Sequence, residues 1–142
     1  MNEFVHIVCP SCNGTNKIPA TAKEAKCGRC KTSLFETKPI NLTSDNYNQH
    51  LEKNDIPVLV DFWAPWCGPC QSMAPNFEAA AKNFSGKVRF AKLNTENEQS
   101  IAGEKGIRSI PTIILYKGGK EIDRISGALD ANNLTQWVNS KI

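Results

Sequence analysis

The sequence predicts an α/β domain, with a central mixed sheet and helices on both faces, preceded by a small cysteine-rich module. Strand-like and helix-like segments alternate in the later part, and the apolar run at 57–64 indicates a strand covered on both faces. The first residues are instead rich in cysteine and turn residues. We therefore expect a small module stabilised by a bound metal over residues 1–36 and the α/β domain over residues 37–142.

The first half of the α/β domain contains three expected elements. NLTSDNYNQHLEKND predicts a short helix with Thr43 or Ser44 as its N-cap. PVLVDFWA, residues 57–64, predicts a central strand. CGPCQSMAPNFEAAAKNF, residues 67–84, predicts a helix that Pro75 breaks or kinks.

The second half contains a strand, a helix, a hairpin and a closing helix. KVRFAKLN, residues 87–94, predicts the strand, and ENEQSIAGEKG a helix ending at Gly106. PTIILYKGGKEIDRISG predicts a hairpin that turns at Gly118 and Gly119, and DANNLTQWVNSKI a helix capped by Asp130. About 100 residues can bury a core that folds without a metal.

Composition and charge limit the class of function. Of 142 residues, 40% are hydrophobic and 22% charged, and no apolar run is long enough to span a bilayer. The start, MNEFVHIVCPSC, lacks the features of a secretory signal, so we expect a cytoplasmic protein whose cysteines serve metal binding or redox catalysis. The formal charge of +3 falls to about +1 if four thiolates hold one zinc, so no nucleic-acid partner is expected.

Four upstream cysteines have the spacing of a metal site. Cys9, Cys12, Cys27 and Cys30 form two Cys-x-x-Cys knuckles with fourteen residues between them, and four thiolates suit one tetrahedral zinc. Two local disulfides or an iron ion are the alternatives. Four cysteine ligands leave no open coordination position on the metal for a substrate, so the metal is expected to be structural. His6 is surplus to this set and is expected at the surface.

The downstream pair, Cys67 and Cys70, is expected to be redox-active. It stands where a buried strand ends and a helix begins, so helix N–H groups and dipole would lower the pKa of Cys67. Cys70, one turn further along, can close a disulfide but should be less exposed. Pro69 suits the first helical turn. The alternative is a pair of inert buried thiols, which the flanking Trp66 and the strand-to-helix position disfavour.

Several motifs resemble those of the thioredoxin family. They are FWAPWCGPC with the preceding Asp61, AKLN at 91–94, IPT at 110–112 and GAL at 127–129, and the resemblance covers about residues 38–142. With the four-cysteine segment in front, the whole chain resembles the zinc-bearing bacterial cytosolic type. The resemblance implies a thioredoxin fold preceded by a zinc ribbon.

The resemblance also implies the roles of five residues. Cys67 would attack a substrate disulfide, and Cys70 would resolve the mixed disulfide. Asp61, whose pKa burial should raise, would accept the proton of the resolving cysteine, with Lys92 as its neighbour. A buried polar group without catalytic weight is the alternative for Asp61. Pro111 is expected in the cis form, facing the dithiol.

A flat apolar docking surface is expected around the dithiol. Trp63, Met73 and Phe77 are expected to be packing residues instead. The docking surface would consist of Trp66, Gly68, Pro69, Ile110, Pro111, Gly127 and Ala128.

The implied activity is that of an enzyme, a protein-disulfide reductase. Its electron donor would be a flavin-dependent thioredoxin reductase that uses NADPH. We expect a monomer that binds one structural zinc and no organic cofactor, and that acts on disulfide-containing proteins away from membranes. One alternative is a zinc-ribbon module that binds protein or nucleic acid and carries an accessory dithiol. Another is an oxidising or isomerising enzyme, which Pro69 between the cysteines disfavours.

Overall fold

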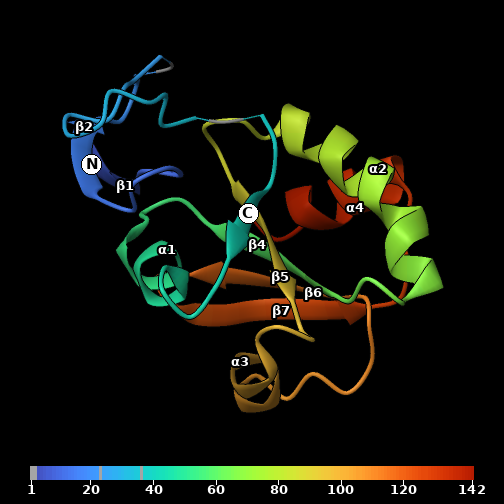
Figure 1. Ribbon diagram of the computed structural model, residues 1–142. Helices are drawn as coiled ribbons and strands as arrows, with labels where there is room; N and C mark the ends of the chain where they lie inside the picture. Colours follow the sequence, from blue (N-terminus) through green and yellow to red (C-terminus); the bar gives the residue numbers. More distant parts are fainter. Residues whose placement is uncertain (1–2, 23, 36) are drawn as a thin grey trace.

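The computed structural model describes residues 3–22, 24–35 and 37–142. A five-stranded sheet in the order β3-β5-β4-β6-β7 forms its centre, and a two-stranded hairpin lies beside it (Figure 1). The elements are β1 (Phe4–Val8), β2 (Thr15–Pro19), β3 (Ile40–Leu42), α1 (Tyr47–Lys53), β4 (Val58–Trp63), α2 (Gly68–Asn83), β5 (Arg89–Asn94), α3 (Gln99–Glu104), β6 (Thr112–Lys117), β7 (Lys120–Ser126) and α4 (Ala131–Asn139).

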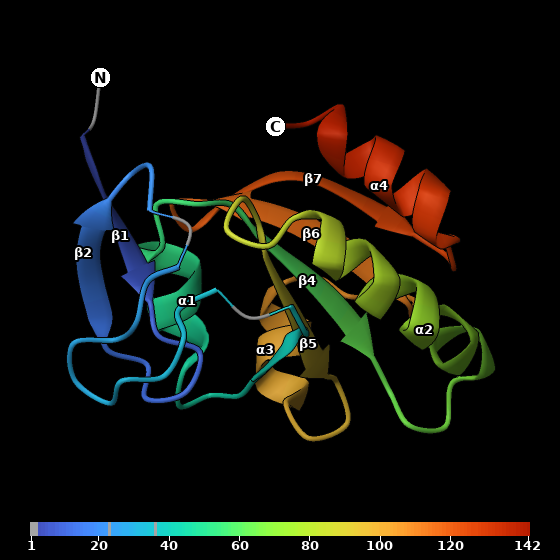
Figure 2. The ribbon, with the colours of Figure 1, turned by 90° about the horizontal axis from the view of Figure 1, so that it is seen from above.

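The central sheet is mixed, as expected, and both of its faces are covered. Strand β4 pairs in parallel with β5 and antiparallel with β6. Val60 and Phe62 of β4 pack in the core cluster that includes α1 and α3 residues, while Leu59 packs in the cluster of α2 and α4. Figure 2 shows the two helix pairs on opposite sides of the sheet. The continuous apolar run of β4 follows from this double burial.

The start of the α/β domain differs from the expectation. Residues 40–42 form the edge strand β3, which was not expected, because three residues are too short to show a periodic pattern. Helix α1 begins only after Asn46, so neither Thr43 nor Ser44 is its N-cap. The Thr43 hydroxyl instead accepts a hydrogen bond from the N–H of Asp45, in a local turn before the helix.

The remaining elements agree with the expected order. Pro75 lies inside α2, which continues through it from Gly68 to Asn83, so the expected break does not occur. The carboxylate of Asp130 caps α4 by accepting the N–H of Asn133 at 2.8 Å. The hairpin β6–β7 turns at Gly118 and Gly119, which have φ values of 59° and 82° that favour glycine. No helix in the described part of the chain is long and apolar enough to cross a membrane.

The β1–β2 hairpin and the following loop form a ribbon that is bound to the main sheet by buried polar contacts. Arg89, at the start of β5, donates to the carbonyl oxygens of Val8 and Leu34 at 3.0 and 2.7 Å. The side-chain oxygen of Asn54 accepts the N–H of Val8 at 2.8 Å. Since Arg89 lies opposite Val58, the ribbon covers the beginning of β4 and β5.

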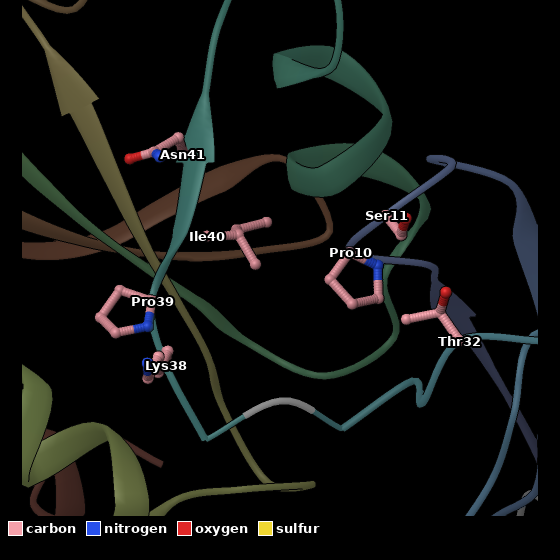
Figure 3. Close-up of a pocket in the computed structure, with 7 residues that line it drawn as sticks. All are labelled: Pro10, Ser11, Thr32, Lys38, Pro39, Ile40 and Asn41. Atoms are coloured by element: carbon pink, nitrogen blue, oxygen red, sulfur yellow. The ribbon is translucent and has the colours of Figure 1, made fainter.

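A hollow of about 490 Å³ separates the ribbon from the edge strand β3 (Figure 3). Pro10, Ser11 and Thr32 line it from the ribbon, and residues 38–41 line it from the other side. The edge of β3 is not a free pairing surface at this point. The side-chain amide of Asn46 donates to the carbonyl oxygen of Asn41, and proline before the strand offers no N–H.

Candidate active site and metal site

The Cys67–Cys70 pair lies where β4 leads into α2. The two residues form a disulfide, with their Cα atoms 5.2 Å apart. Cys67 is the N-cap of α2, and its Sγ accepts the N–H of Cys70 at 3.2 Å. Pro69 occupies the first turn of the helix, where its missing N–H costs little. In the reduced protein the N–H of Cys70 and the dipole of α2 stabilise a thiolate at Cys67.

Both cysteines are more buried than the sequence suggested for an attacking thiol. Cys67 is 5% exposed and Cys70 2%. They pack with Ala64, and the side chains of Trp63 and Ile110 lie against this cluster. Any partner that exchanges with this pair must therefore come close to the surface around Cys67 before its sulfur can be reached.

Segments distant in sequence meet at Cys67. The Ile110–Pro111 peptide bond is cis, as expected, and the carbonyl oxygen of Ile110 lies 3.8 Å from Sγ of Cys67. The N–H of Gly127 donates to the carbonyl oxygen of Pro111 at 2.9 Å, which brings the GAL segment, with Ala128, next to this loop. Of the other expected docking residues, Trp66 is 72% exposed, and Gly68 and Pro69 are also exposed.

Asp61 lies in the middle of β4 and is fully buried. Burial raises its pKa to about 7, although the charge of Lys92 partly opposes this shift. Lys92 is directly opposite Asp61 on β5, and its Nζ lies 4.5 Å from the centre of the Trp63 ring. Neither carboxylate oxygen has a hydrogen-bond partner among the described residues. Asp61 can therefore exchange a proton near neutral pH.

The four upstream cysteines converge on one point of the ribbon. Their Sγ atoms all lie within 4.8 Å of one another, with Cys9 3.5 Å from Cys30 and Cys12 3.6 Å from Cys27. A tetrahedral zinc site with Zn–S bonds of about 2.3 Å has its sulfurs about 3.8 Å apart. The four cysteines thus fit such an ion.

The backbone around the knuckles supports metal-bound thiolates. The N–H groups of Arg29 and Cys30 donate to Sγ of Cys27 at 3.4 and 3.5 Å. The Cys30 N–H and the side chain of Asn16 lower the pKa of Cys27 to about 5. Burial raises the pKa of Cys9 to about 11, and a bound divalent cation would oppose that effect by removing the proton.

Two arginines with structural roles were not identified from the sequence. Arg89, which binds the ribbon, is 4% exposed, and its charge inside the apolar strand KVRFAKLN was the available signal. Arg124 on β7 donates to the carbonyl oxygens of Lys105 and Gly106, at the end of α3. The sequence holds no local signal for this second contact, because its partners lie in a different part of the chain.

Comparison with known proteins relates both parts of the chain to thioredoxins. The model of the Thioredoxin family matches residues 38–140. Thioredoxin C-3 of Corynebacterium nephridii is 41% identical over 138 residues, which is 96% of this chain and 94% of that protein. Thioredoxin 1 of Nostoc sp. is 43% identical over 101 residues, covering 71% of this chain and 94% of its own length. The first of these similarities therefore extends into the cysteine-rich ribbon.

A solved structure shares the fold. A single-site mutant of the thioredoxin from Halobacterium salinarum NRC-1 superposes with a TM-score of 0.67 at 29% identity, covering 74% of this chain and 91% of its own. The mixed sheet with helices on both faces is thus a thioredoxin fold, and the two-stranded hairpin with its four clustered cysteines is consistent with a zinc ribbon. This chain belongs to the thioredoxin family and has the disulfide oxidoreductase chemistry of that family.

Proposed function

We propose that this thioredoxin is a protein-disulfide reductase of the zinc-bearing type called thioredoxin 2. The observation that carries the proposal is the geometry at Cys67. This residue caps α2, accepts the N–H of Cys70 and lies beside the cis-Pro111 loop. Such a position stabilises the thiolate that attacks and leaves a second thiol within reach to resolve the intermediate.

The reaction transfers two electrons from the dithiol to the substrate. The thiolate of Cys67 attacks one sulfur of the substrate disulfide, the other sulfur leaves as a thiolate, and a mixed disulfide forms. Cys70 then loses its proton to Asp61, whose pKa of about 7 suits an acceptor at neutral pH. The Cys70 thiolate attacks Cys67 and releases the second substrate thiolate. Lys92 moderates the pKa of Asp61 by its charge.

The substrates are proteins with accessible disulfides. They would dock on the surface formed by Trp66, Gly68, Pro69, Ile110, Pro111, Gly127 and Ala128. The exposed ring of Trp66 offers apolar contact area beside buried sulfurs, which favours an extended segment pressed against this surface. A flavin-dependent thioredoxin reductase drawing on NADPH would restore the dithiol. The protein acts as a monomer and binds no organic cofactor.

The four-cysteine site would hold one structural zinc. Cys9, Cys12, Cys27 and Cys30 would supply all four ligands, so the ion has no open coordination position and takes no part in the reaction. The chain then divides into a zinc ribbon at 1–36 and a thioredoxin domain at 37–142, a division supported by the family match from residue 38. A site of four thiolates favours a reducing compartment, and we place the protein in the cytoplasm.

A coupled turnover assay tests the reductase proposal. The protein is mixed with thioredoxin reductase, NADPH and insulin, and NADPH oxidation is followed together with insulin thiols. We expect turnover by the wild type and by Thr95→Ser, a mild change outside the dithiol, and none by Cys67→Ser. Absence of turnover by a folded, zinc-loaded wild type would contradict the proposal. A redox potential typical of oxidising enzymes would favour the oxidising or isomerising alternative.

A further inference from the structure

The loop that carries the cis-proline is held at both of its ends. At its later end, the hydroxyl of Thr112 donates to the carbonyl oxygen of Ser109 at 2.6 Å. The N–H of Gly127 donates to the carbonyl oxygen of Pro111 at 2.9 Å. Ile110 lies between Ser109 and Pro111, within the span that these two contacts hold, and its carbonyl oxygen is 3.8 Å from Sγ of Cys67. Residues 106–108 join this span to the turn after α3, so the position of the earlier part of the loop depends on how that turn is held.

Arg124 of β7 holds this earlier end. One guanidinium nitrogen, Nη2, donates to the carbonyl oxygen of Lys105 at 2.9 Å, and Nη1 reaches that of Gly106 at 3.5 Å. Both carbonyls belong to the turn that follows α3, where helix C-terminal carbonyls lack partners within the helix and favour a cation. Arg124 lies opposite Ile114 of β6, so the contact ties the turn to the central sheet.

The guanidinium is itself fixed in position. Its Nε and Nη2 atoms donate to the two carboxylate oxygens of Glu121 at 2.8 and 2.6 Å, a paired geometry that orients the plane of the guanidinium. The side chains of both residues are 36% exposed. The ion pair therefore orients the N–H groups of Nη1 and Nη2 that donate to the turn. Its own contribution to stability is small because water screens it.

Lys105 is held by its side chain as well as by its carbonyl. Its Nζ lies 5.5 Å from the ring centre of Tyr47 in α1 and 5.6 Å from that of Tyr116 in β6. These rings belong to the buried core on that face of the sheet. The turn after α3 is thus fastened by Arg124 on one side and by two aromatic rings on the other.

We propose that Arg124 is a positioning residue for substrate docking, which holds loop 106–111 so that Ile110 and Pro111 stay next to Cys67. The inference rests on the proposed protein-disulfide reductase function. Without the two carbonyl contacts, the loop would sample positions away from the dithiol. Protein substrates would then dock less tightly, because part of their binding surface would have to be ordered on binding. The chemistry between Cys67 and Cys70 would be unchanged.

The test compares Arg124→Met, Arg124→Lys and the control Lys120→Met. Lys120 lies on the same strand, is exposed and faces Lys117, so its replacement removes a cation without touching the loop. For Arg124→Met we expect KM for insulin to rise about 3- to 10-fold, the loss expected for charge-assisted hydrogen bonds, with kcat changed less than about twofold. Arg124→Lys should recover part of this loss, and the control should match the wild type.

Two further measurements separate positioning from other effects. Reduction of a small aromatic disulfide should proceed at the wild-type rate, because such a reagent does not need the loop. Hydrogen exchange at the amides of residues 107–110 should quicken about 3- to 10-fold in Arg124→Met and less in Arg124→Lys. Unchanged exchange and KM in folded Arg124 variants would overturn the inference, as would an equal loss with the small disulfide. If the wild type fails to reduce insulin, the reductase proposal fails, while the exchange data still decide the role of Arg124.

Discussion

At the scale of single residues, Asp61 shows a conflict between stability and chemistry. A carboxyl group buried in an apolar strand favours its neutral form, which raises its pKa from the ordinary 3.8 to about 7. The charge of Lys92 reduces this pKa shift. Among the described contacts Lys92 donates no hydrogen bond to the carboxylate of Asp61, since its Nζ lies over the ring of Trp63. The same burial that brings the pKa of Asp61 close to neutrality therefore destabilises its ionised state.

Replacing Asp61 with Asn should stabilise the protein in a pH-dependent way. The folded state binds this proton more tightly than the unfolded state, so wild-type stability falls as pH rises from about 4 to about 7. Because Asn cannot ionise, the variant does not lose this stability as pH rises. Above pH 7 its free energy of unfolding should exceed that of the wild type by up to about 4 kcal/mol. Urea unfolding at pH 5 and pH 8 checks this, and an equal difference at both values would contradict it.

Replacement of the two active-site cysteines should separate their roles. In the proposed mechanism Cys67 attacks and Cys70 resolves, so mixed disulfides with substrate proteins should accumulate in Cys70→Ser. Cys67→Ser should accumulate none, since Cys70 is only 2% exposed. Non-reducing gels and mass spectrometry of the trapped species provide the measurement. Trapping seen only with Cys67→Ser would reverse attacker and resolver.

At the scale of elements, the contact between ribbon and sheet is polar and buried. Asn54, at the end of α1, is 2% exposed; it accepts the N–H of Val8 and donates to the carbonyl oxygen of His50. His50 is neutral at pH 7, because burial and the charge of Arg89 lower its pKa to about 4. These contacts join β1 to the main domain through groups that water cannot reach.

Asn54→Ala should therefore weaken the attachment of the ribbon to the main domain. The buried N–H of Val8 would lose its partner, at a cost of about 1–3 kcal/mol. Asn48→Ala, on the exposed face of the same helix, serves as the control and should cost less than about 0.5 kcal/mol. Urea unfolding of the zinc-loaded proteins measures both. Equal effects of the two substitutions would show that the buried hydrogen bond contributes nothing specific.

At the scale of the whole molecule, the ribbon and the dithiol lie at opposite ends of the central strands. The ribbon is fastened where β4 and β5 begin, at Val58 and Arg89, and Cys67 follows the end of β4. The six residues of β4 place about 17–20 Å between these ends. The four clustered cysteines of the ribbon are thus too far from Cys67 to exchange disulfides with it inside one chain.

Loss of zinc or of the ribbon should therefore affect stability more than activity. We expect about one zinc per chain, released by peroxide as the thiolates oxidise, measured with a chromogenic chelator. A truncated protein beginning near Pro39 should still reduce insulin, because the dithiol is distant from the ribbon. It should also unfold at lower urea, because Arg89 loses its contacts to two carbonyl groups. A folded truncated protein without activity would place the ribbon in the catalytic machinery.

For the fold, local patterns in the sequence predicted the long elements and their order. The apolar run of β4, the glycines of the β6–β7 turn and the Asp130 cap are local signals. Each predicts the strand, turn or helix start in which it lies. Strand β3 was missed, because three residues form a strand only when β5 is already beside them. The same holds for the start of α1, where the local turn at Thr43 displaced the expected cap.

For the site, the sequence alone identified the Cys-x-x-Cys pairs and the buried Asp61, since spacing and an apolar context are written along the chain. The burial of Cys67 and the residues that hold the ribbon and the cis-proline loop follow instead from how the folded chain packs. Arg89 meets Val8 across 81 positions, and Arg124 meets Lys105 across 19. Such contacts depend on chain segments brought together by packing. The charge inside the apolar strand KVRFAKLN indicates that Arg89 has a partner but not which one, and no short stretch of sequence marks the contact of Arg124.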